Sequence, residues 1–314
     1  MPRLRRSNLS KPGFTRTGAG SFSGTGITAA DRARAEALAI PPAWKDVWIA
    51  PHANAHIQAT GMDVAGRRQY IYHEQWREKK DRAKFERALD LAAALPTARR
   101  RVTTDLRTTG ANRDRALAAA FRMLDTGALR IGSERYATAN GSHGLSTLLC
   151  AHARVSGTTV ALQFPAKSGH AWSSEIDDED LAKFISTLKH RGPTARLIAW
   201  KDEGEWHPLA PEEINDYVRE CTGGQFTAKD FRTLRGTVAA AVRLADHGPE
   251  KTRTGRSRAL AQAMRDAADA LGNTAAIAKK SYVDPRIAAH YRRGRTIDVG
   301  SGSADAALRR LLVG

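Results

Sequence analysis

The chain has 314 residues, about twice a typical domain length, which favours two domains with modest cores. Its 50 Lys and Arg outnumber its 33 Asp and Glu, and the formal charge of +17 favours a polyanionic partner, with nucleic acid as the leading candidate. The sequence has no long apolar span, so it gives no indication of a membrane partner. Its two cysteines lie far apart and its N-terminus lacks the apolar core of a secretory signal, which fits a reducing, cytoplasmic setting.

The first third of the chain predicts a basic arm followed by a small sheet. Residues 1–30 contain five basic and no acidic residues, with many Ser, Gly and Thr, and we expect a disordered arm there. A short helix over residues 30–38 should end before Pro41 and Pro42. Short segments rich in β-branched or aromatic residues then predict a small twisted sheet, with strands at 47–50, 56–60 and 69–73.

A domain boundary is expected near residue 99. Residues 75–95 have a helical pattern, and Pro96 should stop that helix. The basic run Arg99–Arg101 is predicted to be a solvated hinge. The expected domains are therefore a β-rich N-terminal domain over 31–98 and a helical domain over 99–314.

The remainder of the chain is mainly helical, with a sheet inserted into it. Helices are predicted at 112–129, at 143–150 and from Pro211 to the end. The strand-like segments between them are an antiparallel pair, 155–164 and 170–176, and a hairpin, 196–200 with 205–208. The fold class is α+β, with a small β-rich N-terminal domain followed by a larger, mainly α-helical domain that contains an inserted antiparallel sheet.

Nothing in the sequence indicates a cofactor. The Gly-rich stretch Gly18–Gly26 is not followed by the Lys-Ser/Thr of a phosphate-binding loop. His52 and His56 lack the glutamate and third ligand of a zinc protease helix, and neither cysteine lies in a Cys-x-x-Cys motif. We therefore expect no metal and no cofactor.

Four segments contain the residue types that suit metal-free cleavage of a nucleic-acid strand. Such cleavage needs a nucleophile that conserves the phosphodiester energy, cations for the transition state, and an acid for the leaving 5′ oxygen. Tyrosine, arginine and lysine suit these tasks. In chain order the segments are Leu129–Tyr136 with Asn140–Leu148, Phe164–Gly169, Lys229–Thr237, and Leu271–Thr274 with Lys279–Pro285.

In this order the four segments resemble the active-site boxes of type IB DNA topoisomerases, and the resemblance runs from about Ala39 to Gly294. It implies that Tyr282 attacks one DNA strand and forms a 3′-phosphotyrosyl link. Rotation of the free end would then relax supercoiled DNA before the strand is resealed. The resemblance implies neither ATP nor metal, and it is closest to the bacterial, poxvirus-like branch.

The resemblance also implies the roles of the other site residues. Arg130 and Arg232 would bind the scissile phosphate, and Lys167, at the tip of the predicted hairpin, would be the general acid. Asn273 lies nine residues before Tyr282, the interval at which the family has a transition-state hydrogen-bond donor. Viral and eukaryotic members usually have histidine there, and asparagine resembles the bacterial branch.

Two assignments stay open at this point. Arg232 and Arg235 lie three residues apart on one helical face, so spacing does not decide which of them reaches the phosphate. Tyr291 is the fallback nucleophile. An isolated Arg, Lys or Tyr is more often a surface or packing residue, so the joint occurrence of the segments carries the assignment.

Further residues are expected to contact DNA. The segment Gly66–His73 resembles the strand with which the family's clamp touches its duplex, although it could equally be a half-buried strand whose tyrosines cover a core. The expected DNA contacts are Arg67, Gln69, Tyr70, Tyr72, Tyr136, Lys279 and Lys280. The resemblance implies a double-stranded DNA substrate and a monomer that forms a clamp in the bacterial nucleoid, with no obligate protein partner.

Two rival functions share part of this pattern. A tyrosine recombinase uses the same Arg, Lys, Arg and Tyr chemistry, but usually has His-x-x-Arg where this chain has Lys229–Arg232, and a helical domain in front. A non-catalytic basic DNA-binding protein would fit the charge. It would leave the occurrence of all four segments unexplained.

Overall fold

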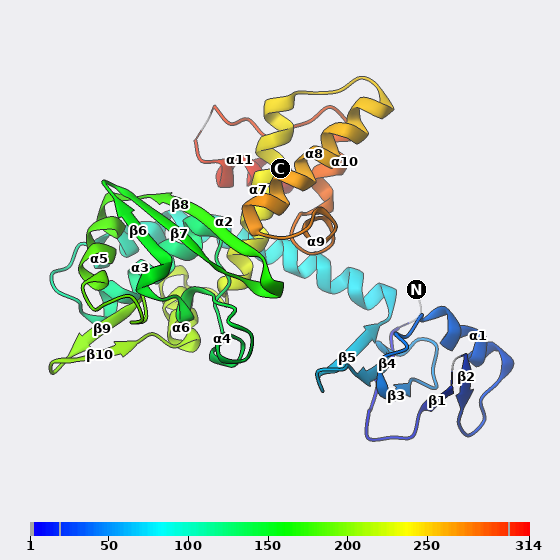
Figure 1. Ribbon diagram of the computed structural model, residues 1–314. Helices are drawn as coiled ribbons and strands as arrows, with labels where there is room; N and C mark the ends of the chain where they lie inside the picture. The colour runs from blue at the N-terminus through cyan, green and yellow to red at the C-terminus, as the bar shows by residue number, and fades with distance from the viewer. Residues whose placement is uncertain (1–2, 19, 301) are drawn as a thin grey trace. The chain divides into compact units, whose positions relative to one another are not determined.

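The computed structural model describes residues 3–18, 20–300 and 302–314, which form two compact units, Met1–Ala83 and Lys84–Gly314 (Figure 1). A sheet dominates the first unit, and helices with small antiparallel sheets form the second, so the expected α+β class is confirmed. Within the described ranges, no helix is both long and apolar enough to cross a membrane.

An antiparallel five-stranded sheet forms the N-terminal unit, in the order β2-β1-β3-β4-β5. Its strands are β1 (Phe14–Gly18), β2 (Ser21–Ser23), β3 (Lys45–Ile49), β4 (Ile57–Met62) and β5 (Arg68–Tyr72). Thr28 is the N-cap of helix α1 (Ala29–Ala37), and its side chain forms a capping box with Asp31. The helix and sheet enclose a small core of Phe14, Phe22, Ala35, Val47, Ile49 and Ala59. The predicted helix and strands are therefore confirmed.

The structure corrects the expected disordered arm over residues 1–30, of which residues 1, 2 and 19 lie outside the described residues. Arg5 pairs with the 54–56 segment through backbone hydrogen bonds of 2.9 Å, and Ser7 donates to the carbonyl of Ile57. Phe14 and Phe22 are buried in the core. Composition predicted disorder because polar residues dominate, but two buried phenylalanines and strand pairing are enough to order the segment.

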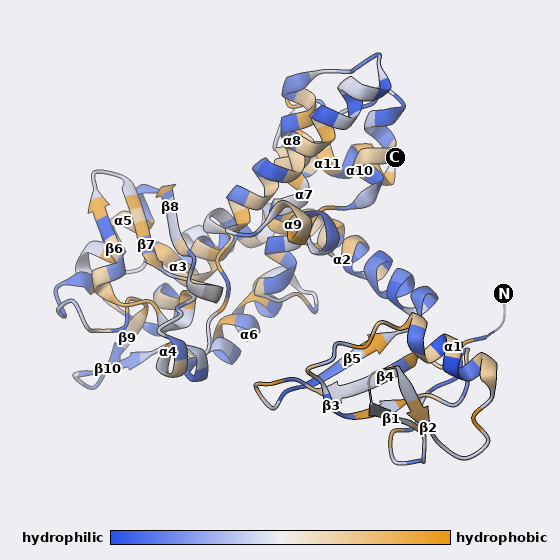
Figure 2. Ribbon diagram, turned by 45° about the vertical axis from the view of Figure 1, so that its right-hand side comes forward, coloured by the Kyte–Doolittle hydropathy of each residue, from blue (hydrophilic) through white to orange (hydrophobic). Residues whose placement is uncertain are grey.

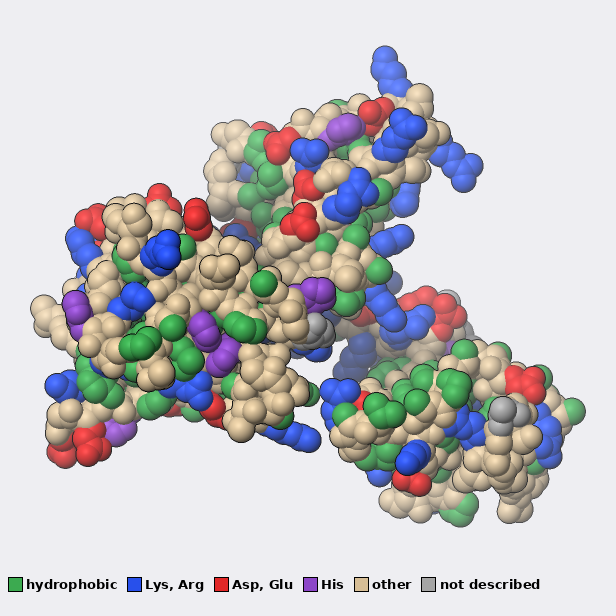
Figure 3. Space-filling model, viewed as in Figure 1, with side chains coloured by type: hydrophobic (Ala, Val, Ile, Leu, Met, Phe, Trp, Pro, Cys, Tyr) green, Lys and Arg blue, Asp and Glu red, His purple; other side chains and the backbone are tan. Residues whose placement is uncertain are grey.

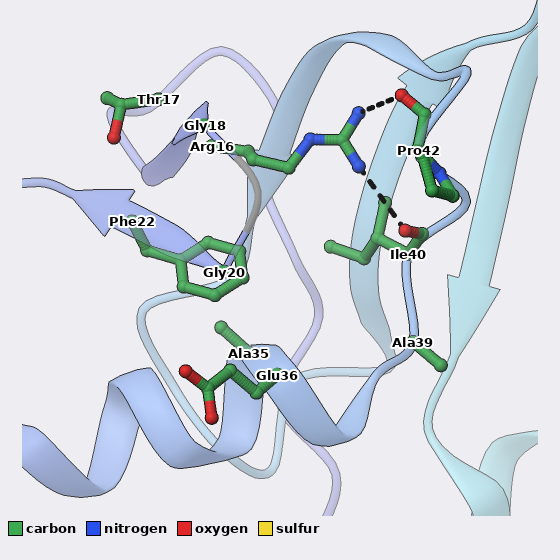
Figure 4. A pocket seen from close by; sticks show the side chains of 10 residues that line it. All are labelled: Arg16, Thr17, Gly18, Gly20, Phe22, Ala35, Glu36, Ala39, Ile40 and Pro42. Carbon is green, nitrogen blue, oxygen red and sulfur yellow. Dashed lines mark hydrogen bonds between the residues drawn. The ribbon is translucent and has the colours of Figure 1, made fainter.

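Arg16 shows how one basic residue of this segment serves the fold. Its guanidinium donates hydrogen bonds to the carbonyls of Ile40 (3.3 Å) and Pro42 (3.1 Å) beside a pocket of about 570 Å³ (Figure 4). It also donates to the carbonyl of Trp44. These carbonyls occupy its donors, so Arg16 ties β1 to the loop before β3.

Helix α2 (Glu74–Leu106) continues through Pro96, where the sequence predicted its end. Its first turns are mostly hydrophilic (Figure 2), whereas later turns bury a stripe that includes Leu91, Leu95, Val102 and Leu106. A proline inside a helix costs about 3 kcal/mol, but each large buried side chain contributes roughly 1.5–3 kcal/mol. Burial on both sides of Pro96 outweighs that cost.

The boundary between the two units lies at Ala83/Lys84 rather than at the expected position 99. Arg99 is not part of a solvated hinge. Its guanidinium binds Asp125 at 2.7 and 2.9 Å and Asp305 at 2.7 Å. Both carboxylates are buried. A cation inside α2 therefore holds other parts of the C-terminal unit together.

Helix α3 (Arg113–Gly127) lies at the centre of the C-terminal unit, and its residues 116–121 are all buried. The other helices are α4 (Glu134–Asn140), α5 (Glu179–Lys189), α6 (Pro211–Thr222), α7 (Ala228–His247), α8 (Arg253–Leu271), α9 (Ala275–Ser281), α10 (Pro285–Arg292) and α11 (Ala304–Val313). Helix α3 packs against α5, α6 and α7. Several Lys and Arg side chains project from the α8–α10 region on the face that Figure 3 shows.

The inserted antiparallel sheet is confirmed. Its three strands, β6 (Ala153–Ser156), β7 (Thr159–Pro165) and β8 (Ala171–Asp177), pair in the order β6-β7-β8. The predicted single strand over 155–164 is divided by a turn at Gly157, whose φ of +58° favours glycine. A separate hairpin joins β9 (Ala199–Asp202) to β10 (Glu205–Pro208), also as predicted.

The helix predicted over 143–150 is wrong, because two short 3-10 turns occupy Leu145–Thr147 and Cys150–His152. Gly144 passes so close to the backbone of Arg130 and Gly132 that an added Cβ would lie 2.6–2.7 Å from it. The amides of Leu145 and Ser146 donate to the carbonyls of Arg130 and Ile131 at 2.8 Å. Pairing with the Arg130 segment therefore replaces hydrogen bonds within a helix.

Candidate active site

Tyr282 lies immediately after α9, half-buried against α7. The Thr237 hydroxyl of α7 donates to the Tyr282 carbonyl (3.0 Å) and accepts from the Asp284 amide (3.1 Å). At Gly236, an added Cβ would lie 3.1 Å from the Cβ of Tyr282. A glycine and a threonine in consecutive positions therefore let this loop lie directly on α7.

Arg232 of α7 lies beside the phenol, with its guanidinium carbon 5.1 Å from the centre of the Tyr282 ring. The side chain is buried and donates to the carbonyls of Ala128 (2.5 Å) and Leu271 (2.8 Å). Burial, followed by the like charge of Arg130, lowers the pKa of Arg232 to about 10. Arg232 is therefore still a cation at neutral pH, held by two carbonyls in a fixed orientation.

Arg130 and Asn273 lie together at the same site. Arg130 donates a hydrogen bond of 2.7 Å to Oδ1 of Asn273, which directs the amide nitrogen Nδ2 of that residue elsewhere. This nitrogen and Nε of Arg232 are both buried, and neither has a hydrogen-bond acceptor among the described residues. Buried donors without acceptors are costly, so their presence favours a site for an oxygen-rich anion.

The charges around Tyr282 favour its ionised form. Burial raises the pKa of the phenol, but the cations Arg232, Arg130 and Lys229 outweigh burial and leave the pKa below its ordinary value. Lys229 is exposed and lies one helical turn before Arg232 on α7. The surrounding cations can therefore produce a phenolate nucleophile more readily than free tyrosine can.

Lys167 lies in the short 3-10 turn Lys167–Gly169 at the tip of the β7–β8 hairpin, and it is exposed. The end of β8 next to this turn lies beside the site. Trp172 of β8 packs on Gly272, where an added Cβ would lie 2.7 Å from the indole ring. Gly272 directly precedes Asn273, so β8 brings the Lys167 turn into the neighbourhood of the other candidates.

The two assignments that spacing left open are distinguished by their contacts. Arg235 donates to the backbone and the carboxylate of Asp125 and lies 3.5 Å from Asp305, so its charge belongs to the network that includes Arg99. Tyr291 is buried, its hydroxyl donates to the Gly248 carbonyl at 2.8 Å, and burial raises its pKa. Arg232 and Tyr282 are therefore the pair that meets at the candidate site.

The expected DNA contacts are spread over both units. In the N-terminal unit, the exposed rings of Tyr70 and Tyr72 stack at 5.9 Å on one face of β5. Arg67 and Gln69 both bind the carboxylate of Asp63. In the C-terminal unit, the expected contacts are Tyr136 on α4 and Lys279 and Lys280 on α9, and all three are exposed.

Residues that could hold a metal ion do not gather at this site. Across residues 3–18, 20–300 and 302–314, no group of three or more His, Cys, Asp and Glu side chains is arranged to bind one. The candidate site is built from two arginines, an asparagine and a tyrosine.

Sequence reasoning missed Lys229, Gly236, Thr237 and Trp172 as residues of this site. Lys229 could have been found, because it lies in the same short motif as Arg232, at a spacing that places both on one helical face. The other three contact the site through packing or backbone hydrogen bonds, which leave no motif in the sequence.

Two family models and two relatives match this chain. The model of the catalytic core of eukaryotic DNA topoisomerase I matches residues 73–293, and that of the N-terminal domain of bacterial DNA topoisomerase IB matches residues 21–63. DNA topoisomerase 1B of Acanthamoeba polyphaga mimivirus is 31% identical over 264 residues, which cover 82% of this chain and 79% of that protein. DNA topoisomerase 1 of Mycosarcoma maydis is 25% identical over 197 residues, which cover 56% of this chain and 19% of that protein. The chain therefore belongs to the type IB DNA topoisomerase family, whose members cleave and rejoin DNA.

Proposed function

We propose that Tyr282 is the nucleophile with which this type IB topoisomerase relaxes supercoiled DNA. One observation carries the proposal: Arg130, Arg232 and Asn273, from three distant segments, meet around this phenol, and two buried donors there have no acceptor among the described residues. A scissile phosphate would supply those acceptors and neutralise the two arginines.

The reaction is an in-line exchange of one phosphoester for another. The phenolate oxygen of Tyr282 bonds to phosphorus as the bond to the 5′ oxygen breaks, after the phenol proton has passed to water. The Lys167 ammonium gives its proton to the leaving oxygen, which yields a free 5′ hydroxyl and a 3′-phosphotyrosyl link. The reverse reaction reseals the strand after rotation, and phosphodiester energy is conserved without ATP.

Electrostatics supply the transition-state stabilisation. Charge accumulates on the non-bridging oxygens, and Arg130, Arg232 and the Asn273 amide would donate to them in an orientation fixed before DNA arrives. Arg232 is held by the carbonyls of Ala128 and Leu271, so little reorganisation is needed. Two guanidinium groups can thus stabilise charge that metal-dependent nucleases neutralise with metal ions.

DNA contacts outside the candidate site would position the duplex. Tyr70 and Tyr72 present exposed aromatic faces, with Gln69 on the same strand and Arg67 directly before it. Tyr136, Lys279 and Lys280 would bind backbone near the scissile phosphate. We further propose that the chain acts as a monomer whose two units clamp the duplex, in the nucleoid of a bacterial cytoplasm and without an obligate protein partner.

Plasmid relaxation tests the proposal. Negatively supercoiled plasmid is incubated with the purified protein in EDTA without ATP, beside Tyr282→Phe and Tyr291→Phe. Relaxation by the wild type and by Tyr291→Phe, with none by Tyr282→Phe and a covalent DNA adduct on Tyr282, is the expected result. A Tyr282→Phe protein that still relaxes DNA, or strand exchange at a preferred site, would refute it.

A further inference from the structure

Four aromatic rings form a continuous row beneath the Lys167 turn. His143 meets His152 edge to face at 4.6 Å, His152 lies 6.0 Å from Phe164, and Phe164 stacks on Trp172 at 6.1 Å. We call this row, His143–His152–Phe164–Trp172, the aromatic ladder. Its last ring rests on Gly272, the residue before Asn273.

The ladder lies directly below the hairpin tip. Phe164 and Trp172 are cross-strand partners in β7 and β8, and only the Pro165–Ala171 pair and the bond from the Ala166 amide to the His170 carbonyl separate them from the turn. Both rings are buried. The orientation of the tip therefore depends on how this pair of rings is seated.

Each end of the ladder is fixed to a different part of the site. At one end, the His143 amide donates to the Pro165 carbonyl (2.8 Å) and the His143 ring bonds to the Thr147 carbonyl (2.7 Å). At the other end, Gly272 has a φ of +55° and leaves room for the Trp172 indole. Burial, followed by the electrostatic effect of the neighbouring His143 ring, lowers the pKa of His152, which favours an uncharged ring in the middle of the row.

We infer that the aromatic ladder is a positioning device for the general acid, which sets the Lys167 turn at a fixed place relative to Asn273. Phe164 and Trp172 are its positioning residues. The inference rests on the proposed role of Lys167 as the acid. A flexible, exposed lysine at a hairpin tip contributes little as an acid unless its backbone is held, since a displacement of about 1 Å can cost about 10²-fold in rate.

A change of leaving group provides the test. A duplex that the wild type cleaves at one site is prepared with either oxygen or sulfur at the 5′ bridging position of that phosphate. A thiolate is a much weaker base than an alkoxide, so it leaves without a proton from the enzyme. Single-turnover cleavage is measured for Phe164→Ala, Trp172→Ala and Lys167→Ala on both substrates.

We expect Phe164→Ala and Trp172→Ala to cleave the oxygen substrate about 10- to 100-fold more slowly than the wild type, and the sulfur substrate within about threefold of its rate. Near-normal cleavage of the sulfur substrate also shows that each variant is folded. The matched control is Trp200→Ala, which removes a ring that packs 4.8 Å from His207 on the separate β9–β10 hairpin and should leave both rates unchanged.

The failures can be told apart. Equal losses on both substrates for the ladder variants, beside a Lys167→Ala protein that sulfur does rescue, would overturn the ladder's role and leave the acid in place. Cleavage of the oxygen substrate by the ladder variants at the wild-type rate would overturn the ladder's role as well. A Lys167→Ala protein that sulfur does not rescue would overturn the assignment of the acid itself, and the ladder's role with it.

Discussion

Arg130 binds the side-chain oxygen of Asn273 at 2.7 Å, although 143 positions separate the two residues in the chain. The bond fixes which way the asparagine amide points and leaves its nitrogen buried without an acceptor among the described residues. Asn273 and Arg130 thus form one unit, in which the arginine orients the amide beside the proposed phosphate site.

Replacement of Asn273 by alanine should slow DNA cleavage about 10²- to 10³-fold, because the transition state loses one preorganised donor. Binding of uncleaved DNA, measured with the Tyr282→Phe background, should change much less. Asn273→His should retain most of the activity, since an imidazole N–H also donates a hydrogen bond. An alanine variant that cleaves at the wild-type rate would remove Asn273 from the mechanism.

Lys229→Ala should shift the pH dependence of cleavage to higher pH. Lys229 is one of three cations that hold the pKa of Tyr282 below its ordinary value, so its removal raises that pKa and less phenolate exists at neutral pH. The deficit at pH 7 should stay below about tenfold, because Lys229 is exposed and solvent screens its charge, and it should vanish at high pH. Lys183→Ala, on α5, serves as the control, and a Lys229→Ala profile that only scales down at every pH would contradict the prediction.

Gly236→Ala should impair cleavage without a change of charge. The new Cβ would lie 2.8 Å from Cδ1 of Leu271 and 3.1 Å from the Cβ of Tyr282, so the tyrosine must move away from α7. A displacement near 1 Å predicts a loss of about 10²-fold in the single-turnover rate. Gly18→Ala, whose Cβ would find its nearest neighbour at 3.8 Å, is the control, and equal rates for the two variants would be inconsistent with this packing.

Asp125→Asn should destabilise the C-terminal unit by about 3–5 kcal/mol, because it leaves Arg99 and Arg235 with a neutral partner in a buried network. Urea denaturation measures the loss in the free energy of unfolding. Asp216→Asn, in an exposed pair with Arg219, is the control and should change that free energy by less than roughly 0.5 kcal/mol.

The same network predicts a pH dependence of stability. Burial raises the pKa of Asp125, but Arg99 and Arg235 more than compensate and lower it. A lowered folded-state pKa gives stability that is present above the unfolded pKa of about 4 and is lost as pH falls through the folded value. The difference in stability between the wild type and Asp125→Asn should therefore narrow in strong acid, and a constant difference would argue against the ion pairs as its source.

Replacement of both Tyr70 and Tyr72 by alanine should weaken DNA binding while the cleavage rate at saturating protein stays near the wild-type value. Their exposed, stacked rings lie in the N-terminal unit, so removal of each ring should reduce the affinity for DNA rather than the rate of the chemical step. Fluorescence anisotropy and single-turnover cleavage together measure the two effects. A defect confined to the chemical step would show that these tyrosines act differently.

The sequence alone predicted much of the secondary structure and the family of this protein. Strand alternation and glycine turns predicted strands β3, β4 and β5 of the N-terminal sheet and the β7–β8 hairpin, but not β1 and β2, and four short motifs in order predicted the family. These predictions succeed because strand periodicity and catalytic residue types are local properties that a few neighbouring positions determine. The same local rules failed at Pro96, where burial of apolar side chains against distant parts of the chain outweighed a helix-breaking residue.

Tertiary structure alone decided how the site is assembled. Arg232 and Arg235 share one helical face by spacing, yet Ala128 and Leu271 hold the first beside Tyr282, and Asp125 binds the second. Which partner each charge meets depends on how α3, α7 and the turn before α9 pack, and that packing minimises the cost of buried charge and unpaired backbone over the whole core. No short stretch of the sequence contains that information.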